Sequence, residues 1–155
     1  MCSDPNFPDP VFPEASEARL LVLDTNIVLD AFLFNDPTTQ SLKQALASKK
    51  IHWLATQAMR AELARVLAYP KIIVHLAYYQ LSAEQVLSQF DEQAQIADAA
   101  PKASVSCCDP DDQKFIDLAV AHKAVLLSKD QAVLCLAKRL SALGVRTQAT
   151  LGFAP

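Results

Sequence analysis

The stretch that decides the fold is residues 20–26, Leu-Leu-Val-Leu-Asp-Thr-Asn, in which an apolar run leads directly into an acid. A short apolar run bounded by polar residues is typical of a strand buried on both faces, as in a parallel sheet. Further runs follow the same pattern at residues 51–54 and 125–127, with a weaker one near 145–149. Longer amphipathic segments separate them. This alternation predicts an α/β fold with helices on both faces of a mainly parallel sheet.

The segments between these runs carry helix start and stop signals. A helix is predicted over residues 56–68, with a threonine N-cap before it and a proline after it. A Ser-x-x-Gln capping box opens a long amphipathic helix predicted over residues 82–99. Asp109, followed by proline, predicts another helix start, and Asp130 is predicted to cap the helix after the third strand.

Composition indicates one globular domain. The chain has 155 residues, of which 52% are hydrophobic and 20% charged, and its net charge is -3. Residues 1–18 are rich in proline and lack a helical or alternating pattern, so we expect a flexible arm followed by a single domain over residues 19–155. No apolar run reaches the roughly 18 residues of a membrane-spanning helix, and the N-terminus has no secretion-signal pattern. A cytoplasmic location is therefore expected.

Two scarce residue types exclude several function classes. The only glycines are Gly144 and Gly152, so no GxGxxG turn and no GxxxxGK[ST] loop is present. Dinucleotide oxidoreductases and P-loop NTPases are thereby excluded, and any chemistry on phosphate must use a metal or side chains. The 4 cysteines form neither a CxxC pair nor a disulfide framework, which indicates reduced thiols.

Acidic residues stand where they can reach the carboxyl edge of the sheet, the edge at which such folds bind ligands. They are Asp24, Glu62, Asp112 and Asp130. Each has an ordinary structural alternative. Asp24 and Asp130 also suit helix N-caps, and an acid in a first helical turn, such as Asp112, is favoured by the helix dipole. Glu62 borders the apolar face of its helix, where it can also pair with Arg65.

Helical geometry separates the acids around Asp112. Asp112 lies on the side of Phe115, which faces inward, whereas Asp117 is expected to point away. Asp111 stays open as a candidate, because it lies one turn before Phe115. The sequence therefore favours Asp112 for the site without excluding Asp111.

Taken in order, these motifs resemble the PIN domain family over about residues 19–150. The resemblance rests on Asp24-Thr25-Asn26 after an apolar strand, Glu62 on its helix, Asp112 followed by Phe115-Ile116 and Ala119, and the run Leu126-Leu127-Ser128-Lys129-Asp130. The stretch Cys-Asp-Pro-Asp-Asp-Gln-Lys-Phe at 108–115 and Tyr69-Pro70-Lys71 are similar to a PIN subgroup of toxin components of bacterial toxin–antitoxin pairs.

This resemblance implies a three-layer α/β/α sandwich that hydrolyses phosphodiester bonds of single-stranded or structured RNA with Mg²⁺ or Mn²⁺. It also implies the toxin role in a pair with a cognate antitoxin protein. Carried over residue by residue, the catalytic and metal-binding acids are Asp24, Glu62, Asp112 and Asp130. Asn26 and Ser128 are supporting residues that orient waters or a phosphate oxygen.

Elementary electrostatics agrees with a metal at such a cluster. Four carboxylates in one cleft repel one another, so some stay protonated unless a divalent cation compensates their charge. Mg²⁺ prefers oxygen ligands and can activate a water for in-line attack on phosphorus. In this scheme Asp24 and Asp112 bind the ion directly, while Glu62 and Asp130 bind it directly or through water.

Substrate and partner surfaces are less sharply defined. Arg60, Arg65 and Lys71, with Lys49-Lys50, can form a strip for a phosphate backbone, although a solvated helix face is the plainer explanation. Apolar residues over 72–99 are explained largely as core. The remainder would be a surface for an antitoxin helix or for a second copy of the chain, and the resemblance favours a homodimer.

Two alternatives to a nuclease remain at this stage. Asp24 after a strand also resembles the nucleophile of haloacid dehalogenase-type phosphatases, but those carry a second acid two residues later, where this chain has Asn26. A noncatalytic PIN-like scaffold that binds protein or RNA is the other alternative. Retention of the full acidic set argues against it.

Overall fold

One five-stranded parallel sheet forms the centre of the computed structural model, which describes residues 19–150. Its strand order is β3-β2-β1-β4-β5. The strands are β1 (Arg19–Leu23), β2 (Ile51–Ala55), β3 (Ala94–Ile96), β4 (Val125–Leu127) and β5 (Thr147–Gln148). In the centre, Leu21 of β1 lies opposite Trp53 on one side and Val125 on the other. The run at residues 20–23 is thus the fully flanked strand that its apolar sequence predicts.

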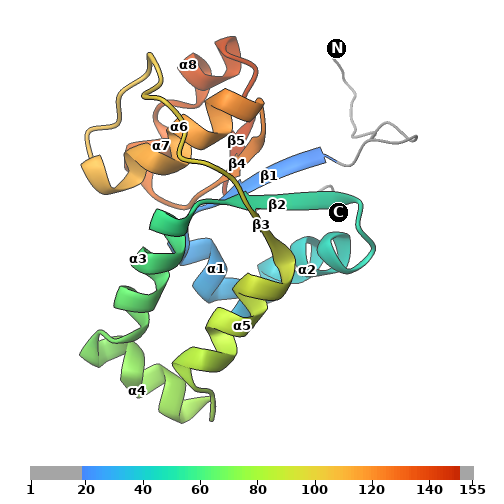
Figure 1. Ribbon diagram of the computed structural model, residues 1–155, viewed down its shortest axis with the longest axis vertical. Helices are drawn as coiled ribbons and strands as arrows, with labels where there is room; N and C mark the ends of the chain where they lie inside the picture. The colour runs from blue at the N-terminus through green and yellow to red at the C-terminus, as the bar shows by residue number, and fades with distance from the viewer. Residues whose placement is uncertain (1–18, 151–155) are drawn as a thin grey trace.

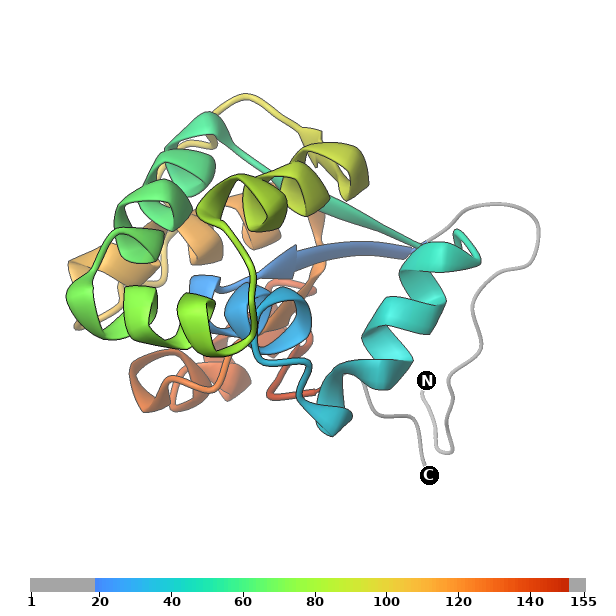
Figure 2. The ribbon, with the colours of Figure 1, turned by 90° about the horizontal axis from the view of Figure 1, so that it is seen from below.

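Helices cover both faces of this sheet, which confirms the predicted three-layer α/β fold. In Figure 1, α1, α2 and α5 lie on one side of the strands, and α6 and α8 lie on the other. Figure 2 shows α1 enclosed by α3, α4 and α5. The helices are α1 (Thr25–Phe32), α2 (Gln40–Ala47), α3 (Gln57–Leu67), α4 (Pro70–Tyr78), α5 (Ala83–Gln93), α6 (Gln113–His122), α7 (Gln131–Leu134) and α8 (Ala137–Ala142), with 3-10 turns η2 (Pro37–Thr39) and η3 (Pro110–Asp112).

The core is built around Trp53 of β2, which is buried between two helices. Its ring stacks on Phe32 of α1 at a centroid distance of 5.8 Å and meets Phe90 of α5 edge-on at 5.0 Å. On the other face, Phe115 and Leu118 of α6 are buried against the strands. Aromatic contacts of this kind hold helices to a sheet through large buried area and defined geometry.

Most helix boundaries follow the signals in the sequence. Thr56 caps α3 through its Oγ1, which accepts the backbone N–H of Met59 at 3.3 Å. The capping box of Ser82 and Gln85 is present at the start of α5. Asp109 and Asp130 are N-caps, as predicted.

The helix predicted over residues 82–99 is too long. It ends at Gln93, and the chain then forms β3, whose Ile96 pairs with Ala55 of β2. Backbone pairing with a neighbouring strand decides this segment, because Ala94, Gln95 and Ile96 carry no alternating pattern that would mark an edge strand. β3 therefore adds a strand to the sheet that the sequence did not indicate.

Other expectations meet the structure only in part. The arm predicted for residues 1–18 lies outside the described residues. Within the described range, Cys107, Cys108 and Cys135 are free cysteines. None of the helices in residues 19–150 combines the length and apolar character needed to cross a membrane.

Candidate active site

The site lies where the strand order of the sheet reverses. From β1, the chain adds β2 and β3 on one side and later β4 and β5 on the other, so the crevice between the carboxyl ends of β1 and β4 is the expected ligand position. Asp24 follows β1, while Ser128 and Asp130 follow β4. The backbone N–H of Asp24 donates to the Leu127 carbonyl at 3.0 Å. This bond holds the two strand ends together.

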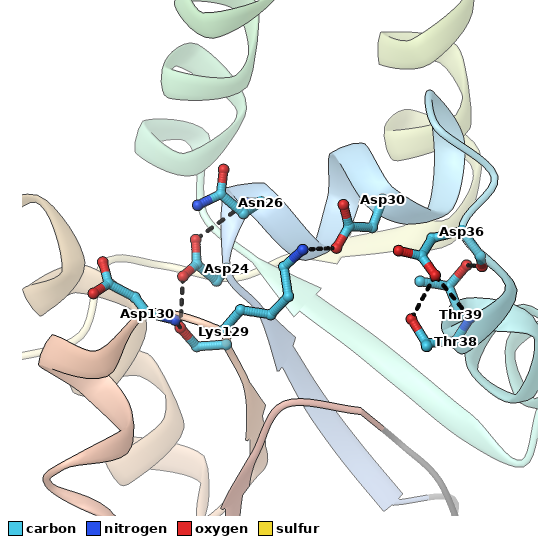
Figure 3. A network of polar contacts seen from close by, with 9 residues as sticks. Asp24, Asn26, Asp30, Asp36, Thr38, Thr39, Lys129 and Asp130 are labelled. Atoms are coloured by element: carbon cyan, nitrogen blue, oxygen red, sulfur yellow. Dashed lines mark hydrogen bonds and ion pairs between the residues drawn. The ribbon is translucent and has the colours of Figure 1, made fainter.

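Asp24 is a buried carboxylate that accepts two hydrogen bonds (Figure 3). As the N-cap of α1, its Oδ1 accepts the backbone N–H of Asn26 at 3.2 Å. Its Oδ2 accepts the Ser128 hydroxyl at 2.7 Å. Burial raises the pKa of Asp24, against the lowering effect of these two bonds, and the charges of Asp130 and Glu62 raise the pKa further. The N-cap and the candidate site residue are thus the same side chain.

Ser128 connects the two loops of the site. Its side chain is completely buried, donates to Asp24, and accepts the backbone N–H of Asp130 at 3.0 Å. The Asp130 carboxylate in turn accepts the N–H of Ala132 at 2.9 Å, which caps α7. A hydroxyl can donate and accept at once, so Ser128 fixes the distance between the two acidic loops.

Asp112 and Asp130 are hydrogen-bonded to each other, and their pKa values shift in opposite directions. Asp112 is 7% exposed, and burial raises its pKa to about 8, with further contributions from its hydrogen bond to Asp130 and from the charge of Asp24. The same hydrogen bond lowers the pKa of Asp130. The raised pKa of Asp112 and the lowered pKa of Asp130 make Asp112 the partner that holds the proton.

Asp109 joins this pair, although the sequence indicated only a helix cap at that position. Carboxylate oxygens of Asp109, Asp112 and Asp130 lie within 4.8 Å of one another. The Oδ2 of Asp112 is buried and has no hydrogen-bond partner in the described part of the chain. A hard cation with oxygen ligands would satisfy both the crowded charge and this orphaned atom, so the donor set fits Mg²⁺ or Mn²⁺.

Glu62 is held next to the cluster by an ion pair. Its Oε1 lies 2.6 Å from the Nζ of Lys114, which comes from α6. The alternative partner considered from the sequence, Arg65, is exposed and does not take this place. Glu62 is close enough to Asp24 for its charge to raise the Asp24 pKa. Sequence reasoning missed Lys114, because the contact joins two helices that are distant in the chain.

Two other acids near Asp112 stay outside the cluster. Asp111 is exposed and does not belong to the group of carboxylates whose oxygens lie within 4.8 Å of one another. Asp117 accepts the backbone N–H of Ala103 at 2.9 Å and the side-chain amide of Gln113 at 2.8 Å. Asp117 is therefore an anchor for the loop before η3, and replacing it would disturb that loop.

The basic residues proposed for substrate contact differ in their surroundings. The Arg60 guanidinium forms a fork with Asp91 of α5, at 2.7 and 2.8 Å. Arg65 and Lys71 are exposed. Closer to the acids, Lys129 reaches back from the end of β4 to Asp30 of α1 at 2.5 Å (Figure 3).

Fold and site together define a parallel α/β protein with a carboxylate-lined site where the strand order reverses, between the carboxyl ends of β1 and β4. The PIN domain family model matches residues 20–132, more than half of the chain. The chain therefore belongs to the PIN domain family, whose members are generally nucleases. This membership removes the alternative of a haloacid dehalogenase-type phosphatase.

One solved structure shows the likeness of fold. The crystal structure of VapBC2 from Rickettsia felis, bound to a DNA fragment from their promoter, matches with a TM-score of 0.56 at 16% identity. The match covers 83% of this chain and 98% of that chain. A comparison with curated proteins found no match.

Proposed function

We propose that this protein is a metal-dependent endoribonuclease. The observation that carries the proposal is the meeting of Asp109, Asp112 and Asp130, whose oxygens lie within 4.8 Å of one another beside the buried Asp24. Without a cation, the cluster keeps a proton on Asp112, whose pKa is raised to about 8. Carboxylates with shifted pKa values that converge on the crevice between two strand ends are typical of a catalytic site.

The proposed roles extend the set expected from the sequence. Asp24 and Asp112 bind Mg²⁺ or Mn²⁺ directly, and Glu62 and Asp130 bind it directly or through water. Asp109 is added to this set because of its position. When bound, the ion supplies a water of lowered pKa and stabilises charge on the phosphate.

The protein's own groups prepare this site. Ser128 holds the Asp24 carboxylate in one orientation through its 2.7 Å hydrogen bond, and Asn26 fixes the other oxygen through its backbone N–H. Lys114 balances the charge of Glu62. Hydrogen bonds that orient ligating carboxylates are a regular part of metal sites. Asn26 also presents an exposed side chain at the start of α1, where it can orient a water or a phosphate oxygen.

RNA, single-stranded or structured, is the proposed substrate, on the strength of the family resemblance. Arg65 and Lys71 are the exposed cations of α3 and the start of α4 that can contact its backbone. Arg60 is a weaker candidate, because Asp91 already occupies its guanidinium. Backbone contacts of this kind position a nucleic acid without reading its sequence.

Cleavage is expected to depend entirely on a divalent ion. Purified protein incubated with labelled RNA should produce cuts in Mg²⁺ or Mn²⁺, none in EDTA, and cuts again when the ion is restored, because carboxylates alone cannot activate the water. Product lengths on a denaturing gel provide the measurement. Full activity in EDTA would contradict the proposal, and RNA binding without cleavage in any metal would favour the noncatalytic scaffold.

We also propose that the protein is the toxin of a toxin–antitoxin pair and that it forms a homodimer. The similar fold of VapBC2 from Rickettsia felis supports an antitoxin partner. An exposed apolar face on α4 supports self-association: Val74 is 67% exposed and Tyr78 is 77% exposed, with Tyr69 and Ile73 beside them. Figure 1 places α4 at the end of the molecule farthest from the sheet. Large apolar patches on a surface mark interaction sites.

The dimer is tested by a charge placed in this face. Val74→Lys should convert a dimer into a monomer in sedimentation at low micromolar concentration, because a lysine cannot be buried against apolar side chains without a partner. Ala47→Lys, at an exposed position of α2, is the control and should leave the dimer intact. A wild-type protein that sediments as a soluble monomer would remove the claim.

A further inference from the structure

A second hollow lies at the opposite edge of the sheet from the acidic site. This amino-edge pocket, with a volume of about 490 Å³, is lined by residues at the starts of β1, β4 and β5 and by residues of α8. Because all strands are parallel, their starts lie at the edge away from Asp24 and Asp130. The pocket is therefore separate from the site described above.

The lining of this pocket is strongly basic. Arg19, Lys123, Lys138 and Arg146 all contribute to it, and no carboxylate does. Within residues 19–150, no ion pair joins Lys123, Lys138 or Arg146 to an acid. Ion pairs with acids in residues 19–150 are formed by Arg60, Lys114 and Lys129, none of which lines this pocket. Three of the cations in the amino-edge pocket, Lys123, Lys138 and Arg146, thus form no ion pair with an acid of the described residues.

Lys123 reaches the pocket from the C-terminal end of α6. Lys123 ends α6 in the left-handed conformation, with a φ of 52°, so its side chain turns toward α8 and β5. Gly144 lies beside its aliphatic stem, and a Cβ there would come within 3.3 Å of the Lys123 Cδ. Because Gly144 has no side chain, the aliphatic part of Lys123 can lie against its backbone.

The charge of the chain is also unevenly distributed along its length. Four of the 17 acidic residues lie in residues 1–18, so residues 19–150 carry 13 acidic side chains against 14 basic ones. Several of those acids gather at the carboxyl edge of the sheet, in the acidic site. Opposite edges of one small sheet thus carry opposite charge.

We propose that the amino-edge pocket binds backbone phosphates of the RNA strand that the acidic site cleaves. This inference rests on the proposed function. Lys and Arg are the usual partners of phosphate, and the lining of this pocket also includes Ser141 and Thr147.

The lining also indicates which phosphate compound fits. No aromatic side chain lines the pocket, so a base would find nothing on which to stack. A mononucleotide gains much of its affinity from its base, whereas a polynucleotide backbone needs only phosphate contacts. The pocket therefore suits a passing backbone better than a free nucleotide.

The test compares two doubly substituted proteins of equal charge. Lys138→Gln with Arg146→Gln removes two cations from the pocket, and Lys43→Gln with Lys102→Gln removes two exposed or half-exposed cations from elsewhere. Binding of a fluorescein-labelled single-stranded RNA of about 20 nucleotides, longer than the roughly 4–16 that a small binding fold covers, is measured by anisotropy in EDTA. Thermal unfolding verifies that each variant folds, and Lys138→Gln alone replaces the double variant if it does not.

We expect the pocket variant to bind RNA roughly 10-fold more weakly at low salt. The slope of its log affinity against log salt concentration should be smaller in magnitude by about 1.4, because each lost phosphate contact reduces that slope by about 0.7 for a single strand. The control should match the wild type. In Mg²⁺, the pocket variant should show a raised KM for long RNA with kcat unchanged, because the acids are untouched.

Unchanged RNA affinity in the pocket variant would overturn the inference while leaving the nuclease proposal intact. If the wild-type protein binds RNA through the pocket but does not cleave it, the nuclease proposal fails while the pocket inference stands. AMP bound by the pocket without any change in RNA affinity would assign it to a free nucleotide instead. The four acids in residues 1–18 are a competing occupant of the pocket. They would be identified as its occupant if replacing them with amides lowered the melting temperature of the wild type but not that of the pocket variant. That result, together with an RNA affinity that the pocket substitutions leave unchanged, would overturn the inference.

Discussion

Asp24→Asn is expected to lower RNA cleavage by at least about 100-fold, since even the outer partners of metal ligands cost roughly 10- to 100-fold when replaced. The substitution removes a buried negative charge from the strand end where the proposed ion binds. The protein should still fold, because asparagine caps helices about as well as aspartate. Initial rates on labelled RNA at saturating Mg²⁺ provide the measurement, and circular dichroism verifies the fold.

The structure offers a closely matched control for this substitution. Asp36 is also an N-cap aspartate, with its carboxylate accepting the backbone N–H and hydroxyl of Thr38 at 2.9 and 2.8 Å (Figure 3). Asp36→Asn makes the same chemical change at the start of η2, outside the acidic cluster, and should leave cleavage within about twofold of wild type, as is usual for surface changes away from such features. Equal losses in both variants would show that the effect comes from capping and not from the site.

Asp112→Asn is expected to abolish cleavage to a similar extent and, without metal, to make the protein more stable at pH 8. Asp112 is a buried acid among other acids, with its pKa raised from 3.8 to about 8. Its ionisation is easier in the unfolded chain than in the folded one. An amide needs no ionisation, so the variant escapes this cost.

The sign of the pH dependence follows from linkage. Between about pH 4 and pH 8, the folded protein holds a proton on Asp112 that the unfolded chain has lost, so the stability of the metal-free wild type falls as pH rises through this range. The raised pKa of Asp24 acts in the same direction. Asp130, with its lowered pKa, contributes stability that is lost only as pH falls below about 3.8. Melting temperatures in EDTA from pH 5 to 8 should therefore decline less steeply for Asp112→Asn.

Asp111→Asn is the control, because Asp111 is an exposed acid in the same turn. It should keep both the activity and the pH profile of the wild type. Asp117→Asn cannot serve this purpose, since Asp117 anchors the backbone of Ala103 and its loss would destabilise the preceding loop. Identical pH profiles for wild type and Asp112→Asn would mean that Asp112 does not hold the buried proton.

Local patterns predicted the parts of this molecule that local physics determines. The apolar run at 20–23, the acid that ends it and the caps at Thr56 and Asp130 each follow from a few neighbouring residues. β3 could not be predicted, because a three-residue edge strand takes its conformation from β2 and not from its own side chains.

In the acidic site, too, some residues are predictable from their neighbours in the sequence, whereas others depend on contacts between distant segments. Asp24, Glu62, Asp112 and Asp130 occupy positions that strand ends and helix faces indicate. Asp109 was not predicted as a site residue, because its role as a helix N-cap already explains an aspartate before a proline. The pairing of Glu62 with Lys114 depends on how α3 and α6 meet over the sheet, and no spacing in the sequence encodes that distance.

Asp24, Asp109 and Asp130 each cap the backbone of the turn or helix that follows, in addition to lying in the acidic site. Selection on folding and selection on chemistry therefore act on the same codons. Most replacements would harm both properties at once, but a single base change converts an aspartate codon into one for asparagine, which preserves the cap and removes the charge. Under the nuclease function proposed above, the shortest evolutionary route from this protein leads to a folded descendant without activity. A lineage could thus turn a nuclease of this kind into a binding protein in one step.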